Sequence, residues 1–170
     1  MSLAQMMLAE FQQEAQTTRK FLERLPEDKL EWRPHPKSMT AGQLALHIAQ
    51  APAGVVRMAQ EDVFPAPDFG RSNPQPANTR EVLNALEESI ATVTKVLPTF
   101  SDQQMQTMWK MKAGDKELLA MPRAAVLRTI LLNHWYHHRG QFGVYLRQLG
   151  AKVPSSYGPS GDEQPDFMQK

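Results

Sequence analysis

Apolar residues recur every three or four positions in four long segments of the chain. This spacing matches the turn of an α-helix, and the segments cover about residues 3–25, 40–58, 78–97 and 122–149. No segment reads as a strong strand. The pattern predicts an all-α fold, namely an up-down four-helix bundle with proline-rich connecting loops. We expect a single domain over residues 1–170, with an irregular tail from about residue 151.

Capping residues mark the start of the second and third predicted helices. Thr40 is followed three residues later by Gln43, and Asn78 by Glu81, as in a capping box. Pro52 lies inside the second apolar stripe, and proline removes a helical hydrogen bond. We therefore expect the second helix to kink or to end early at Pro52.

The last helix is predicted to be the longest. Pro122 suits its first turn, Gly150 is a typical C-terminal stop, and the length is roughly 40 Å. For the segment before it, residues 103–119, we expect a short helix followed by a turn at the sequence AGDK.

Composition removes several classes of function. The 170 residues carry a net charge of +1, so the charge gives no reason to expect a nucleic-acid partner. No apolar run is long enough for a membrane span, and the N-terminal segment lacks the basic start of a signal peptide. Cysteine is absent, which excludes disulfides, thiolate ligands and a cysteine nucleophile. We expect a cytoplasmic protein.

Three of the five histidines lie within five residues of the last helix. With His134 at 0° on a helical wheel, His138 falls at about 40°, in the middle of the apolar stripe. His137 falls at about −60°, at the edge of that stripe. On the second helix, His47 shares the stripe with Leu44. Two helices thus place imidazoles where leucine is expected.

A metal ion would account for these inward histidines. Imidazoles at positions i and i+4 can reach one ion, and a third imidazole would come from the other helix. Three neutral nitrogens suit Zn, Ni, Cu or Fe(II) and leave a coordination position open. The alternative is a polar core network without metal. His35, which stands between two prolines, is expected to be exposed.

The same wheel gives further expectations for residues of the last helix. Gln141 and Tyr145, together with His137, are candidate pocket residues or hydrogen-bond partners of the ligands. Gly140 and Gly143 lie on the opposite face, where their small size predicts a helix contact within the chain or across a dimer. Arg139 and Arg147 are expected to face outward, without the basic cluster that nucleic acid would require.

Three stretches resemble the DinB-like (damage-inducible) family of metal-binding four-helix bundles. They are SMTAGQLALHIAQ, NHWYHHRGQFGVYLRQLG and VPSSYGPSGDE, and the similarity in order and spacing runs from about Leu3 to Glu163. The resemblance implies a divalent metal, commonly zinc or nickel, bound by His47, His134 and His138. Relatives of this family include thiol-dependent S-transferases and a maleylpyruvate isomerase, and homodimers are common among them.

These observations lead to one leading hypothesis and two alternatives. The leading one is a metal-dependent enzyme that transfers a low-molecular-weight thiol onto a small-molecule substrate, with the metal lowering the pKa of the thiol. The second is a metal-dependent hydrolase, although no general base is visible in the sequence. The third is a non-catalytic metal- or ligand-binding bundle in a stress response.

Overall fold

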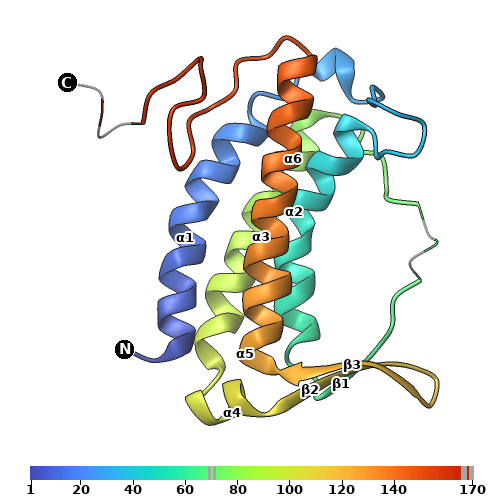
Figure 1. Cartoon of the computed structure of the whole chain (residues 1–170), viewed down its shortest axis with the longest axis vertical. Coiled ribbons are helices and arrows are strands. Elements are labelled where there is room, and N and C mark those ends of the chain that lie inside the picture. Colours follow the sequence, from blue (N-terminus) through green and yellow to red (C-terminus); the bar gives the residue numbers. More distant parts are fainter. Residues whose placement is uncertain (69, 71, 166–167, 169–170) are drawn as a thin grey trace.

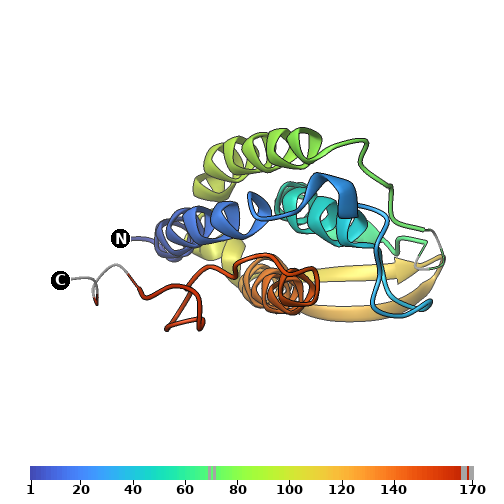
Figure 2. The ribbon, with the colours of Figure 1, turned by 90° about the horizontal axis from the view of Figure 1, so that it is seen from above.

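Four long helices form the body of the molecule. The computed structural model describes residues 1–68, 70, 72–165 and 168. Figure 1 shows the helices side by side, and Figure 2 shows them end-on, with α3 and α6 on opposite sides of α1 and α2. Their apolar stripes meet in one core. The bounds are α1 (Leu3–Leu22), α2 (Ala41–Met58), α3 (Thr79–Val96) and α6 (His134–Gln148).

The helix starts agree with the capping patterns in the sequence. The Thr40 side chain accepts from the Gln43 backbone N–H, and the Gln43 side chain accepts in return from the Thr40 backbone, which completes the capping box. Asn78 also caps α3, but the Glu81 carboxylate accepts from the Ala77 backbone N–H. The expected early end at Pro52 is wrong, because α2 continues to Met58.

The helices do not alternate in direction, so the expected up-down order is wrong. In α2, the Ala53 backbone N–H donates a hydrogen bond to the Ser89 hydroxyl of α3, and the Arg57 guanidinium donates to the Thr92 hydroxyl. Because residue numbers increase in the same direction along both helices, α2 and α3 run parallel. Phe11 of α1 stacks on Trp135 of α6, and Phe21 lies beside Gly143, so α1 and α6 also run parallel. The connection between α2 and α3 causes this order, because it returns along the whole bundle (Figure 1).

A small sheet at one end of the bundle corrects the all-α expectation. It contains β1 (Val63–Pro65), β2 (Met108–Ala113) and β3 (Lys116–Pro122), in that order. β1 pairs parallel with β2, and β2 pairs antiparallel with β3. The short helix expected before the AGDK turn is present as α4 (Asp102–Gln106), but the flanking residues form a β-hairpin.

The predicted last helix consists of three consecutive helical parts. α5 (Arg123–Val126) follows Pro122 and leads into a π-helical segment, Leu127–Asn133, which continues into α6. The His134 backbone N–H donates to the Thr129 carbonyl, five residues earlier, which is the π-helical pattern. The wider turn therefore ends at the first histidine of the predicted cluster. Gly150, with φ of 74°, follows the helix as expected.

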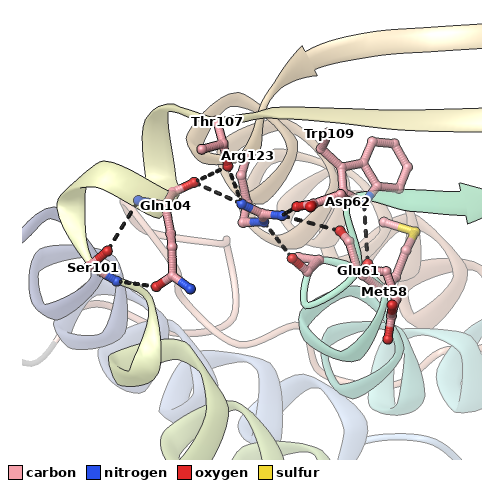
Figure 3. Close-up of polar contacts among 9 residues, drawn as sticks. Met58, Glu61, Asp62, Ser101, Gln104, Thr107, Trp109 and Arg123 are labelled. Atoms are coloured by element: carbon pink, nitrogen blue, oxygen red, sulfur yellow. Dashed lines mark hydrogen bonds and ion pairs between the residues drawn. The ribbon is translucent and has the colours of Figure 1, made fainter.

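Arg123 connects the sheet to the helical bundle through several hydrogen bonds and an ion pair (Figure 3). Its buried guanidinium donates to the backbone carbonyls of Ala59 at 2.6 Å, Gln104 at 2.8 Å and Glu61 at 3.3 Å. It also donates to the Thr107 hydroxyl and pairs with the Asp62 carboxylate. A guanidinium group has five N–H donors in one plane, which lets it bind several acceptors at once. The Arg123 side chain therefore joins the end of α2, the end of α4 and the sheet.

Candidate metal centre

Three histidines from two helices converge between α2 and α6. His47 comes from α2, and His134 and His138 come from successive turns of α6. One ligand nitrogen of each lies within 4.8 Å of those of the other two. The ring centroids of His134 and His138 are 4.4 Å apart, and the His47 centroid lies 5.4 Å from that of His134 and 4.7 Å from that of His138. The structure thus brings together the same three side chains that the helical wheel places inward.

Gln141 sets the tautomer of His138. Its side-chain oxygen lies 2.9 Å from the His138 Nδ1 atom. Because an amide oxygen can only accept, the His138 Nδ1 atom carries the proton and its Nε2 atom presents a lone pair. That Nε2 atom lies 2.9 Å from the His134 Nε2 atom. Gln141 therefore points the His138 lone pair into the cluster, as a hydrogen-bond partner of a metal ligand does.

The surroundings keep all three imidazoles neutral. Burial, together with the smaller effects of the neighbouring His138 and His134, lowers the pKa of His47 to about 4. Burial also lowers the pKa of His134, with smaller contributions from His138 and His137. For His138, burial again lowers the pKa, against the opposing effect of the Gln141 hydrogen bond. Neutral imidazoles are the form that binds metal ions.

The His134 and His138 Nε2 atoms lie within hydrogen-bond distance of each other, but within the described chain this contact leaves one buried imidazole nitrogen of the cluster without a partner. Among the residues that the structure describes, the buried Nδ1 atom of His134 has no partner. An unsatisfied buried nitrogen is unusual in a purely structural core, so it argues against a closed histidine network. All three side chains are only half-buried. Each of the three histidines therefore keeps some exposure to solvent, unlike the ligands of a sealed structural site.

The donor set fits a divalent transition metal. Nitrogens bound to one ion at about 2.0–2.1 Å lie about 2.9–3.4 Å apart for angles between a right angle and the tetrahedral value. The 2.9 Å separation of the His134 and His138 Nε2 atoms agrees with the lower end of that range. Within the described part of the chain, no carboxylate joins the three histidines. Three imidazole ligands favour a borderline-soft ion over magnesium or calcium.

The other candidate site residues have separate roles. Tyr145 is buried, but its hydroxyl donates to the Met39 carbonyl at 3.2 Å, and its ring packs against Trp32. It therefore does not act on the histidines through that hydroxyl. His137 is exposed, and its ring lies 5.0 Å from that of His138. His35 is exposed, as expected.

Of the two glycines in α6, Gly140 and Gly143, only Gly143 lies against another described part of the chain. A methyl group at Gly143 would lie 3.2 Å from the Phe21 ring of α1, so this glycine permits close helix packing. Gly140 has open space around it. The contact expected at this face is therefore confirmed for Gly143 alone, and the expected homodimer stays a prediction.

Arg139 corrects the sequence interpretation, because it is buried and does not face outward. Its guanidinium pairs with the Glu14 carboxylate of α1 at 2.6 Å and donates to the Tyr157 hydroxyl of the tail at 2.9 Å. It also lies over the rings of Tyr136 and Tyr157. The ion pair connects α1, and the hydrogen bond to Tyr157 connects the tail, to the helix that carries two of the cluster histidines. Arg147 is exposed, as expected.

Comparison with known proteins places the chain in a family. The sequence matches the DinB family over residues 1–166. This chain belongs to the DinB family. One relative is the uncharacterized protein YrdA of Bacillus subtilis (strain 168), which is 28% identical to this chain over 155 residues. The aligned region covers 91% of this chain and 87% of YrdA.

Two crystal structures of DinB-like proteins share the DinB fold of this chain. One, from Bacillus cereus ATCC 10987, has a TM-score of 0.70 at 24% identity, with 89% of this chain and 95% of that chain covered. The other, YjoA from Bacillus subtilis, has a TM-score of 0.68 at 18% identity, with 89% and 96% covered. In the part of this DinB-family chain that the structure describes, none of the helices combines the length and apolar character needed to cross a membrane.

Proposed function

We propose that this DinB-family protein binds one divalent metal ion, zinc or nickel, through His47, His134 and His138. The observation that carries this proposal is the convergence of the three ligand nitrogens within 4.8 Å from two separate helices. The lowered pKa values of the three imidazoles support it, because each is available as a neutral ligand at neutral pH.

We further propose that the site is catalytic and transfers a low-molecular-weight thiol onto an electrophilic small molecule. When bound, the ion supplies Lewis acidity, which lowers the pKa of a thiol or water beside it. In the transfer, the thiol loses its proton and its sulfur forms the new bond to carbon. In a substitution the leaving group of the electrophile departs with the electron pair of the broken bond, and the thiol proton passes to solvent; in an addition the product takes up the proton.

The residues of the chain favour thiol transfer over hydrolysis. Hydrolysis commonly needs a positioned carboxylate to move a proton, and no Asp or Glu of the described residues joins the cluster. A free thiol has a pKa of about 8.5, which a bound metal ion would lower, so it can ionise at neutral pH without such a base. Gln141 holds the proton at the His138 Nδ1 atom, so the opposite nitrogen keeps its lone pair.

Metal content is the first test. We expect about one zinc or nickel ion per chain in the purified protein by elemental analysis, and loss of that ion in H134A. H35A is the matched control, because His35 is an exposed loop histidine outside the cluster and should leave the metal content unchanged. Equal metal content in H134A and the wild type would remove His134 from the ligand set.

Activity is the second test. The metal-loaded protein is assayed with bacillithiol-like and mycothiol-like thiols and an activated aryl halide, by following the loss of free thiol. We expect conjugation by the wild type and H35A, and none by H134A. If the protein hydrolyses esters or amides without any thiol, the proposed function would be hydrolysis and not thiol transfer. Metal binding without either activity would leave a non-catalytic metal-binding bundle.

A further inference from the structure

Pro52 leaves one carbonyl of α2 without its helical donor. In an α-helix the carbonyl of Ile48 would accept from the backbone N–H four residues later, and proline has none. The helix nevertheless continues for six residues beyond Pro52, to Met58. A buried carbonyl without a partner is costly, so another donor is expected at Ile48.

A side chain of α6 provides that donor. The indole N–H of Trp135 donates to the Ile48 carbonyl at 2.8 Å, and both residues are buried. The next backbone N–H, that of Ala53, donates to the Ser89 hydroxyl of α3 at 2.9 Å. The Trp135 bond is therefore a direct polar link between α2 and α6, made possible by the proline.

This link lies directly beside the histidine cluster. Ile48 follows His47 in the sequence, and Trp135 follows His134. The hydrogen bond therefore joins the neighbours of a histidine on each of the two helices. Because its acceptor is a backbone carbonyl, the bond constrains the position of α2 itself.

The Trp135 ring is held in place on its other side. It stacks on Phe11 of α1, with centroids 4.9 Å apart and planes at 21°. A rigid indole fixed between α1 and α2 allows little sliding of α6 along its axis. Metal ligands need distances within about 0.2 Å of their ideal values, whereas a one-residue slip of a helix moves a side chain by about 1.5 Å.

We propose that Trp135 is a positioning residue for the metal site, and that its hydrogen bond to the carbonyl freed by Pro52 sets the spacing between the two ligand-bearing helices. The inference rests on the proposed metal site. It assigns a role to the indole N–H that goes beyond filling the core.

The test compares two buried tryptophans that each donate to a carbonyl of α2. Trp109 donates to the Met58 carbonyl at 3.2 Å, at the end of α2 and outside the histidine cluster. W135F and W109F each remove one indole N–H and keep an aromatic ring. For each full-length variant we would measure Zn²⁺ affinity by chelator competition, the visible spectrum of the Co²⁺ form, and the urea midpoint of the metal-free protein.

We expect W135F to lower Zn²⁺ affinity by about 10-fold or more, as is common for partners outside the ligand set, and to change the Co²⁺ spectrum. W109F should lower the urea midpoint but leave the affinity within about twofold of the wild type and the Co²⁺ spectrum unchanged. Equal affinities of W135F and W109F for Zn²⁺ would overturn the positioning role.

The double variant P52A/W135F separates positioning from hydrogen-bond satisfaction. P52A restores a backbone N–H that can donate to the Ile48 carbonyl within the helix, but it does not restore the link to α6. We expect the urea midpoint to recover and the Zn²⁺ affinity to stay low. Recovery of wild-type affinity would overturn the inference. This variant also decides the question if W135F alone does not fold.

The two proposals fail in different ways. A wild-type protein that binds neither Zn²⁺ nor Co²⁺ would end the metal proposal, and the positioning role with it. A wild type that binds both ions, together with W135F that binds them equally well, would end the positioning role alone.

Discussion

Gln141 is the residue whose hydrogen bond to the cluster is most direct. Its oxygen accepts from the His138 Nδ1 atom at 2.9 Å, and without that acceptor the imidazole is free to exchange tautomers. We predict that Q141A lowers Zn²⁺ affinity by about 10-fold, measured by chelator competition, whereas Q141E preserves it because a carboxylate also accepts. Q148A, which changes an exposed glutamine of the same helix, is the control. Unchanged affinity in Q141A would contradict the assigned tautomer.

Two helical glycines should respond in opposite ways to alanine. A methyl group at Gly42 would lie 2.7 Å from the Gln75 amide nitrogen and 3.1 Å from the Leu30 carbonyl oxygen, which is backbone. At Gly140 nothing lies within 4 Å. We predict that G42A lowers the free energy of unfolding by about 1–3 kcal/mol. G140A should raise it by roughly 0.5–1 kcal/mol, as helix propensity dictates.

Urea unfolding of both variants against the wild type checks the pair. The result that would contradict this prediction is a loss of stability in G140A, since it would mean that the exposed glycine serves a contact across a dimer. Size measurement of G140A in solution would then show whether an oligomer has been disrupted.

At the scale of elements, the Arg123 guanidinium is a polar connection between the sheet and the bundle, with several buried hydrogen bonds (Figure 3). Lysine would keep the charge but not the planar set of donors, so several buried carbonyls would lose their partner. We predict that R123K lowers the free energy of unfolding by about 2–3 kcal/mol. D62N should cost less than about 1 kcal/mol, because the Asp62 side chain is 81% exposed.

Denaturant titration followed by circular dichroism measures both changes. Equal losses in R123K and D62N would mean that the ion pair, and not the carbonyl contacts, carries the stability of this connection.

The sheet shows what helical periodicity cannot predict. Residues of β2 and β3 include Met, Lys, Leu, Glu and Ala, which are good helix formers, so short runs of them do not identify a strand. The strands form because β1 and Arg123 hold the hairpin against the end of the bundle. These contacts join segments far apart in the sequence, which a local pattern does not contain.

The inward placement of each histidine was predictable because it depends on the local geometry of its own helix. His134 and His138 are one turn apart, and the capping box at Thr40 fixes the start of the helix that carries His47. Arg139 was not predictable in this way, since its burial depends on Glu14, more than a hundred residues earlier in the chain. A helical wheel identifies the core face of one helix but not a charged partner on another.

At the scale of the whole molecule, the fold holds the histidine cluster between two helices that are distant in sequence. α2 carries one histidine of the cluster and α6 carries the other two, and the long return of the chain after α2 places α3 parallel to α2 (Figure 1). A metal ion bound to both helices would connect the two halves of the chain. Unfolding would separate these ligands, so binding should favour the folded protein.

Thermal unfolding should therefore depend on metal concentration. An ion that binds only the folded state stabilises it by about 2.7 kcal/mol at 100 times its Kd, which corresponds to a rise in Tm of roughly 5–10 °C for a domain of this size. We predict this rise for the wild type and H35A on addition of Zn²⁺ to the metal-stripped protein, measured by scanning calorimetry. H134A should show little rise, because two imidazoles bind more weakly than three. A similar rise in all three proteins would indicate binding elsewhere on the surface and would contradict a specific site between α2 and α6.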